Sequence, residues 1–170
     1  MIGQTIRIER LHAIGNDRDA LAELLAAVVD DGASVGFLPP MRREEAGRYW
    51  DGVLPDPDVL LYIARIGGEL AGSVQVQLCA KPNGLHRAEI AKLMTHPRFR
   101  RRGVARALMR TAEAAAAEEG RSLLVLDTRE GDPSNSLYEA LGYARAGRIP
   151  NYARSADGGL DATILYFKYR

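Results

Sequence analysis

The stretch that most constrains the fold joins a predicted strand to a predicted helix through arginines and a glycine. It reads "KLMTHPRFRRRGVARALM" and spans Lys92 to Met109. Its charged turn contains Arg98, Arg100, Arg101 and Arg102. A helix that begins at Gly103 presents backbone N–H groups without intrahelical partners, together with a partial positive charge. Because glycine has no side chain, an anion can approach this backbone closely. The stretch therefore favours a diphosphate cradle with arginines at its rim.

Two other interpretations of the arginine turn are a solvated helix start and a nucleic-acid contact. The chain has 23 Lys and Arg against 22 Asp and Glu, a net charge of +1, whereas general nucleic-acid binders carry a larger basic excess. The run contains one aromatic residue, Phe99, and no second basic patch extends it, so we expect no nucleic-acid partner. The motifs G-x-x-x-x-G-K-[ST] and G-x-G-x-x-G do not occur, which disfavours triphosphate and Rossmann dinucleotide sites.

Length and composition indicate one domain over residues 1–170, with 46% hydrophobic and 26% charged residues. The single cysteine, Cys79, excludes an intrachain disulfide and fits a reducing compartment. Residues 1–10 lack the apolar core of a signal peptide, so we expect a cytoplasmic protein that does not bind membranes. We also expect no metal, because the three histidines show no metal-ligand spacing. These are His12, His86 and His96.

Hydrophobic periodicity predicts an alternation of strands and helices along the whole chain. The predicted strands are residues 4–11, 59–66, 70–80, 86–95, 122–128, 143–149 and 162–169. The predicted helices are residues 17–32, 42–54, 103–119 and 134–141. Asp17 is expected to cap the first helix, and Gly67-Gly68 predicts a hairpin. The strand 122–128 is almost wholly apolar, which predicts that both faces of the sheet are covered there. The order predicts an α/β domain with a mixed sheet.

Two motifs carry a resemblance to a known family. "RRRGVA" at residues 100–105 matches [QR]-x-x-G-x-[GA], and "LYEALGY" at residues 137–143 matches L-Y-x-x-x-G-[FY]. The chain thus resembles the GNAT superfamily of acyl-CoA-dependent N-acetyltransferases, which are common in bacteria. "SVGFLPP", "HRAEIAKLM", "LLVLDTREGDPSNSLYEALGY" and "GRIPNYA" look like its tabtoxin-resistance acetyltransferase branch. The resemblance implies a GNAT fold: a mixed, mostly antiparallel sheet of about seven strands, about four flanking helices, and two splayed parallel central strands.

The resemblance further implies acetyl-CoA as cosubstrate. The amides of residues 101–105 are expected to bind the CoA diphosphate, and the pantetheine arm is expected to pair with strand amides exposed by the splay. An amide near Met94 is expected to polarise the thioester carbonyl. Gly131 stands where many members have an asparagine, so Asn135 is expected to serve the arm from a shifted position. The expected cofactor-binding residues are Leu93, Met94, Arg100, Arg101, Arg102, Gly103, Val104, Ala105, Asn135 and Tyr138.

Removal of a proton from the acceptor ammonium needs a base, because its pKa is about 10. Glu89 lies in an otherwise apolar strand and Asp127 ends another, and partial burial makes a carboxylate a better base. The resemblance supports this pair. The alternatives are a salt bridge from Glu89 to Arg87 or Lys92, and a cap or turn role for Asp127. Tyr138 matches the family's general-acid tyrosine; its alternative is packing of one short helix.

Acceptor choice is expected to rest on the loops "SVGFLPPMRREEAGRYW" and "IPNYARSADGGLD". The expected substrate-binding residues are Phe37, Leu38, Trp50, Glu89 and Asp127. A cover over the sheet is the alternative for Phe37 and Trp50. The predicted function is acetyl transfer from acetyl-CoA to the primary amine of an amino acid, an amino-acid-like toxin or another metabolite, by direct attack in a ternary complex. A non-catalytic acyl-CoA-binding module and a protein N-acetyltransferase stay open, and the family allows a homodimer.

Overall fold

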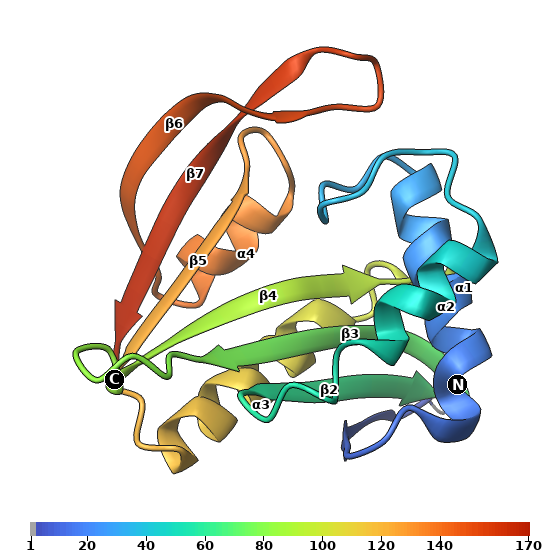
Figure 1. Cartoon of the computed structure of the whole chain (residues 1–170), viewed down its shortest axis with the longest axis horizontal. Helices are drawn as coiled ribbons and strands as arrows, with labels where there is room; N and C mark the ends of the chain where they lie inside the picture. Colours follow the sequence, from blue (N-terminus) through green and yellow to red (C-terminus); the bar gives the residue numbers. More distant parts are fainter. Residues whose placement is uncertain (1–2) are drawn as a thin grey trace.

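One sheet organises the chain, with helices on both of its faces (Figure 1). The computed structural model describes residues 3–170, so the first two residues of the predicted domain lie outside it. The strands are β1 (Ile6–Leu11), β2 (Val59–Ile66), β3 (Glu69–Leu78), β4 (Arg87–Thr95), β5 (Leu123–Arg129), β6 (Ala144–Arg154) and β7 (Leu160–Tyr169). The helices are α1 (Arg18–Asp30), α2 (Arg43–Asp51), α3 (Val104–Glu118) and α4 (Ser134–Ala140). The predicted order of elements is confirmed.

The sheet is mixed and mostly antiparallel, with strand order β1-β2-β3-β4-β5-β7-β6. Its parallel pair is β4 with β5, and the register joins Arg87–Glu89 to Leu123–Val125. Beyond this short ladder the two strands diverge, which Figure 1 shows as a widening wedge between β4 and β5. The predicted fold class, including its two splayed parallel strands, is confirmed.

Two apolar clusters hold the helices against the sheet. On one face α3 packs against the first half of the sheet and α4 lies behind β5, whereas α1 and α2 cover the opposite face (Figure 1). The helical stripe predicted for α3 is buried as expected, because the 3.6-residue period points it at the strands. That stripe is Val104, Leu108, Met109, Ala112, Ala115 and Ala116. Across residues 3–170, none of the helices has the length and apolarity that a bilayer span requires.

Two sequence predictions about local structure are wrong. In β5 the side chains alternate: Leu124 and Leu126 are buried, but Asp127 is exposed, so one face of this strand is not covered. Helix α4 lies behind β5, whereas α1 and α2 cover the β1–β4 half and leave the front face of β5 open (Figure 1). Asp17 does precede α1, but its side chain makes no capping hydrogen bond. It instead accepts a hydrogen bond from Arg65 at 2.6 Å, an ion pair that a linear sequence does not reveal.

The junction of β3, β4 and α3 depends on a glycine, and this gives a first prediction. A Cβ on Gly72 would lie 2.5 Å from Met94 O and 3.0 Å from Val104 Cγ1. Gly72→Ala should therefore lower the free energy of unfolding by about 1–3 kcal/mol through overpacking. Urea unfolding monitored by circular dichroism measures this. Gly147→Ala is the matched control, because a Cβ there meets nothing within 4 Å. Equal midpoints for the two variants would contradict the prediction.

Candidate active site

The widening wedge between β4 and β5 contains a cleft of about 360 Å³. Predicted site residues from three elements line it: Glu89 and Leu93 from β4, Asp127 from β5, and Tyr138 from α4. The loop after α1, at residues 33–36, and residues 152–153 of β6 complete its wall. The cleft therefore brings together predicted site residues that lie up to 49 residues apart in the chain, counted from Glu89 to Tyr138, with wall residues from more distant segments.

Strand register brings the two candidate carboxylates to the same face of the sheet. Glu89 pairs with Val125 across the parallel ladder, and Asp127 lies two residues further along β5. Since side chains on a strand alternate, Val125 and Asp127 point to one face, and Glu89 points to that same face. The short ladder ends at this point, so the carboxylates lie where the strands begin to separate.

A bulge in β4 changes which side chains face the cleft. The register with β3 runs from Gln75 opposite Ala91 to Ser73 opposite Met94, so β4 holds one extra residue there. Lys92 carries the irregular backbone, with φ at +53°, a value that is uncommon outside glycine. Met94 is thereby directed into the core under α1, where its side chain is buried. The side chain of Met94 therefore does not face the cleft, and its contact with a ligand through the backbone stays a prediction.

Burial and charge act together on Glu89. Burial raises the pKa of Glu89 above its ordinary value, the charge of Asp127 raises it further, and the ammonium of Lys92 opposes both. Burial also lowers the pKa of Lys92, while the two carboxylates raise it. Asp127 Oδ2 accepts a hydrogen bond from Thr163 Oγ1 at 2.7 Å, which fixes its orientation. The cleft thus contains a carboxyl group whose pKa is raised by its surroundings.

The cations that were alternatives for pairing with Glu89 have other partners. Arg87 donates to Cys79 Sγ at 3.4 Å, so it turns toward the β3 side of the sheet. Lys92 Nζ donates to Val35 O at 2.7 Å and lies 5.9 Å from the ring centroid of Phe37. The sequence analysis treated Lys92 only as an alternative partner. The sequence feature that could have pointed to Lys92 is a second charged residue, besides Glu89, within a mainly apolar stretch of β4.

Tyr138 lies at the base of the cleft, with only 6% of its surface exposed. Its ring packs against those of Tyr143 and Tyr166, at centroid distances of 5.9 and 5.8 Å. Burial raises the pKa of the Tyr138 hydroxyl far above its usual range, so the group is protonated at neutral pH. Tyr138 therefore both packs α4 and offers a proton donor to the cleft.

Asn135 does not fill the predicted role toward a pantetheine arm. Its side-chain amide donates to Arg129 O and to Asp132 O, both at 2.9 Å. Its side-chain oxygen accepts a hydrogen bond from Tyr166 Oη at 2.8 Å. These three bonds close the turn between β5 and α4 and use the polar atoms of the side chain. The predicted contact through the Asn135 side chain is wrong for this reason.

The start of α3 presents its backbone as the sequence predicted. Gly103 has φ of +82°, and α3 has no side-chain cap there. The first helical hydrogen bond runs from Ala107 N to Gly103 O, so the preceding amides of the first turn have no intrahelical acceptor. Space near Gly103 is open, since a Cβ there would meet only Ile6 Cδ1 at 4.0 Å. These amides are available to an anion.

The arginine side chains before α3 differ in how they are held. Arg100 forms an ion pair with Asp31 at 2.6 Å, and Arg98 forms one with Glu69 at 2.7 Å. The guanidinium of Arg102 lies 5.4 Å from the ring centroid of Phe99, and Arg102 is exposed. Arg101 is also exposed and has φ of +61°. Because Arg100 is already paired with Asp31, Arg102 is better placed than Arg100 to form the charged rim.

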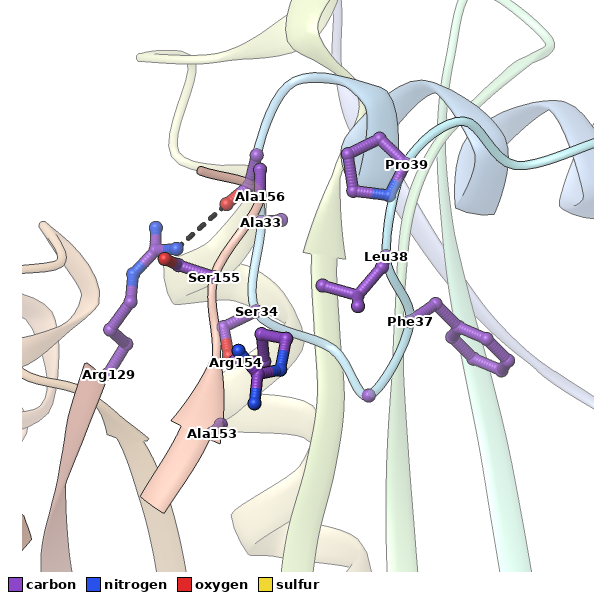
Figure 2. A pocket seen from close by; sticks show the side chains of 12 residues that line it. Ala33, Ser34, Phe37, Leu38, Pro39, Arg129, Ala153, Arg154, Ser155 and Ala156 are labelled. Atoms are coloured by element: carbon purple, nitrogen blue, oxygen red, sulfur yellow. Dashed lines mark hydrogen bonds between the residues drawn. The ribbon is translucent and has the colours of Figure 1, made fainter. Parts of the chain in front are cut away.

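Of the residues predicted to bind the acceptor, some line a cavity and others lie in the hydrophobic core. A second hollow of about 220 Å³ adjoins the cleft, and Phe37 and Leu38 are among its lining residues. In Figure 2 Leu38 points into this hollow, whereas the ring of Phe37 points away, toward Tyr49 at a centroid distance of 5.3 Å. Trp50 is 0% exposed, and its indole N–H donates to Leu21 O at 2.7 Å. The prediction that Trp50 walls the acceptor pocket is wrong, because α2 packs the indole into the core under α1.

Sequence reasoning also missed Arg129 and did not single out Tyr152, and both line the cleft. Arg129 spans from β5 to the loop after α1 and donates to Gly32 O at 2.9 Å (Figure 2). Tyr152 belongs to the late loop that was predicted to affect acceptor choice, and it is largely exposed. Within the described part of the chain, no group of three or more His, Cys, Asp or Glu side chains is arranged to hold a metal ion.

Comparison with known proteins gives consistent matches. A model of the acetyltransferase (GNAT) family matches residues 21–143. An uncharacterized N-acetyltransferase from the hisH–hisA intergenic region of Azospirillum brasilense is 33% identical over 128 residues, which cover 74% of this chain and 76% of that protein.

Two solved structures share the fold over nearly their whole length. An N-acetyltransferase from Staphylococcus aureus Mu50 superposes with a TM-score of 0.83 at 15% identity, over 97% of this chain and 98% of that one. YncA from Salmonella typhimurium, solved with its cofactor acetyl-CoA, gives 0.78 at 15% identity, over 98% and 94%. At these identities the two likenesses concern the fold alone.

The electrostatics of the cleft give a second prediction. Lys92→Met should raise the pKa of Glu89, because the ammonium that favours the ionised carboxylate is removed. Asp127→Asn should lower the pKa of Glu89, because a neighbouring negative charge is removed. Carbon-13 NMR titration of the Glu89 carboxyl measures both shifts. Lys81→Met, which changes an exposed lysine outside the cleft, is the control. Shifts of the same sign in the two cleft variants would refute this account.

Proposed function

The chain belongs to the acetyltransferase (GNAT) family, as an acetyl-CoA-dependent N-acetyltransferase, and on that premise we propose that its acceptor is the primary amine of a small molecule. The observation that carries this proposal is the cleft, in which Glu89 and Asp127 from diverging strands lie with Tyr138 around one space. Acetyl transfer to an amine needs a base for the ammonium, a donor for the departing thiolate, and a site that aligns them.

The residues present fit the acetyl-CoA that the family uses. We propose that the amides of residues 101–105 bind the diphosphate at the uncapped start of α3, with Arg102 as the charged rim. Strand groups of Leu93 and Met94 lie past the end of the β4–β5 ladder, which supports their pairing with the pantetheine arm. When bound, the thioester supplies an activated acetyl group.

Glu89 is proposed as the principal base, with Asp127 as its partner. Its raised pKa makes its carboxylate a stronger base than a glutamate free in water, and it accepts the proton directly or through one water. Asp127 stabilises the ammonium of the acceptor before the proton leaves. Loss of this proton exposes the lone pair of the amine, which attacks the thioester carbonyl while both substrates are bound. The C–S bond then breaks, and the second proton that the nitrogen loses replaces the one that Tyr138 gives to the thiolate.

Tyr138 is proposed as the donor to the departing thiolate. Its hydroxyl is protonated because burial disfavours the phenolate, so a proton is available at neutral pH. An amide near Met94 is proposed to stabilise the negative charge that develops on the carbonyl oxygen. Glu89 and Tyr138 are thus proposed as the base and the acid of the same reaction.

The finer parts of the proposal concern the acceptor and the setting of the enzyme. We propose an amino acid, an amino-acid-like toxin or a related metabolite as acceptor, consistent with the likeness of "SVGFLPP" and "GRIPNYA" to the tabtoxin-resistance branch. Leu38 is proposed to contact the acceptor from the adjoining hollow. We further propose that residues 1–170 act as one acetyltransferase domain in the cytoplasm.

The assigned roles give a third prediction. Glu89→Gln and Asp127→Asn should lower kcat/KM by about a hundredfold or more, the usual contribution of a general base. Tyr138→Phe should lower kcat by about a hundredfold while the Kd for acetyl-CoA stays unchanged. Free-thiol release with a panel of amines and calorimetric binding of acetyl-CoA measure these values. In the wild type, kcat/KM should rise with pH as Glu89 loses its proton, and this limb should vanish in Glu89→Gln. Full activity in all three variants would overturn the roles.

The helix start gives a fourth prediction. Ala105→Glu should raise the Kd for acetyl-CoA by about tenfold or more, because a carboxylate in the first turn repels the diphosphate. The same charge stabilises the helix dipole, so the free energy of unfolding should not fall. Ala114→Glu is the control, an exposed position further along α3. Equal affinity for acetyl-CoA in the two variants would contradict the diphosphate assignment.

A further inference from the structure

We propose that the acceptor amine carries a carboxylate, and that Arg154 and Arg129 bind this carboxylate in the hollow beside the cleft. The inference rests on the proposed transferase function and narrows its acceptor to amines that bear an acid. It assigns a binding site to the carboxylate of the acceptor, a group that takes no part in acetyl transfer.

The hollow adjoins the cleft that contains the candidate bases. The two spaces share lining residues from both sides, including Ser34 and Gly36 of the loop after α1, and Arg129 and Ala153 of the sheet. Arg129 follows Asp127 by two residues on β5, so both side chains lie on the same face. This spacing separates their Cα atoms by about 7 Å, which suits the amine and the acid of one small molecule.

Charge is divided between the two spaces. The charged lining residues of the hollow are two arginines, Arg129 and Arg154. The carboxylates belong to the cleft, where Glu89 and Asp127 are joined by Asp132 and Asp161, against Lys92 and Arg129. The cleft therefore attracts an ammonium, and the hollow attracts an anion. Because the whole chain carries a net charge of only +1, this polarity is a local property.

The two guanidinium groups differ in how their charge is compensated. Arg129 donates to Gly32 O at 2.9 Å and has looser ion pairs with Asp132 at 3.5 Å and Asp161 at 4.0 Å. Arg154 Nη1 donates to Gly158 O at 2.8 Å, a neutral acceptor. The ion pairs found among residues 3–170 do not include Arg154. Arg154 is thus the principal uncompensated charge of the hollow.

The geometry suits a guanidinium–carboxylate interaction. In Figure 2 Arg129 extends from β5 and Arg154 from β6 toward the loop after α1, and Leu38 of that loop lines the same hollow. Guanidinium groups bind carboxylates through paired, charge-assisted hydrogen bonds that fix the orientation of the ligand. Leu38 and Pro39 offer an apolar surface to the part of the ligand between its amine and its acid.

The test compares acceptors that differ only in the acid. L-phenylalanine is paired with phenethylamine, and L-methionine with 3-(methylthio)propylamine, and each rate is referred to the concentration of unprotonated amine, because the acid group also lowers the pKa of the amine. Thiol release from acetyl-CoA should give the wild type a kcat/KM about tenfold or more higher for the acid of at least one pair. Arg154→Gln should remove this preference and leave the rate with the matching amine unchanged. Arg7→Gln, on the opposite edge of the sheet and 77% exposed, should keep the preference.

A second readout does not depend on turnover. 3-Phenylpropionate has the acid without the amine, and calorimetry on the CoA-saturated protein should show that it binds the wild type and Arg7→Gln alike. Its affinity should fall about tenfold or more in Arg154→Gln and in Arg129→Gln. If the two variants lose this binding but the wild type acetylates none of the amines, the carboxylate site is supported and the proposed transferase chemistry is contradicted. Equal rates for acid and amine in the wild type, or binding unchanged in both variants, would overturn the inference.

Discussion

The early end of the β4–β5 ladder is the constraint on which the rest of the molecule depends. After Glu89 pairs with Val125, the facing edges of the two strands no longer satisfy each other's backbone groups. Unpaired backbone groups are costly unless water or a ligand satisfies them, so this gap has to be wet or filled. Helices α1, α2 and α3 pack mainly on the β1–β4 half and α4 packs behind β5, while Glu113 of α3 also forms an ion pair with Lys168 of β7. A site is thus built into the sheet.

The bulge at Lys92 adapts β4 to this gap. In a regular strand, side chains an odd number of residues apart point to opposite faces. Without the bulge, Glu89 and Met94 would therefore lie on opposite faces, and Met94 would be outside the core under α1 whenever Glu89 faced the cleft. The one extra residue of the bulge lets Glu89 face the cleft and Met94 face the core, and it requires a left-handed backbone at Lys92. The same residue then bonds Val35 O, and so ties the irregular point of the sheet to the loop that borders the cleft. Lys92 thus both carries the irregular backbone of β4 and holds the loop after α1 in place.

Local patterns predicted the elements well, because periodicity reports which face of a helix or strand is buried, as in α3. The splayed pair came from a family resemblance, since nothing in two strands about 30 residues apart says that they run parallel. The misses depend on contacts between distant segments. Trp50 is fixed by the carbonyl of Leu21, Asn135 by Tyr166, and Asp17 by Arg65. A bulge likewise changes side-chain direction through its register with a neighbour, which a single strand does not record.

The charges of the cleft also bear on the order of events in the proposed reaction. An acceptor enters as an ammonium, whose charge is attracted by Glu89 and Asp127 and favours the ionised form of Glu89. Acetylation converts that ammonium into a neutral amide, so the attraction that held the amine is lost when the chemistry is complete. The proton then resides on a carboxyl whose pKa burial has raised, and solvent at the open face of β5 can remove it. The loss of positive charge that accompanies acetylation therefore weakens the hold on the product.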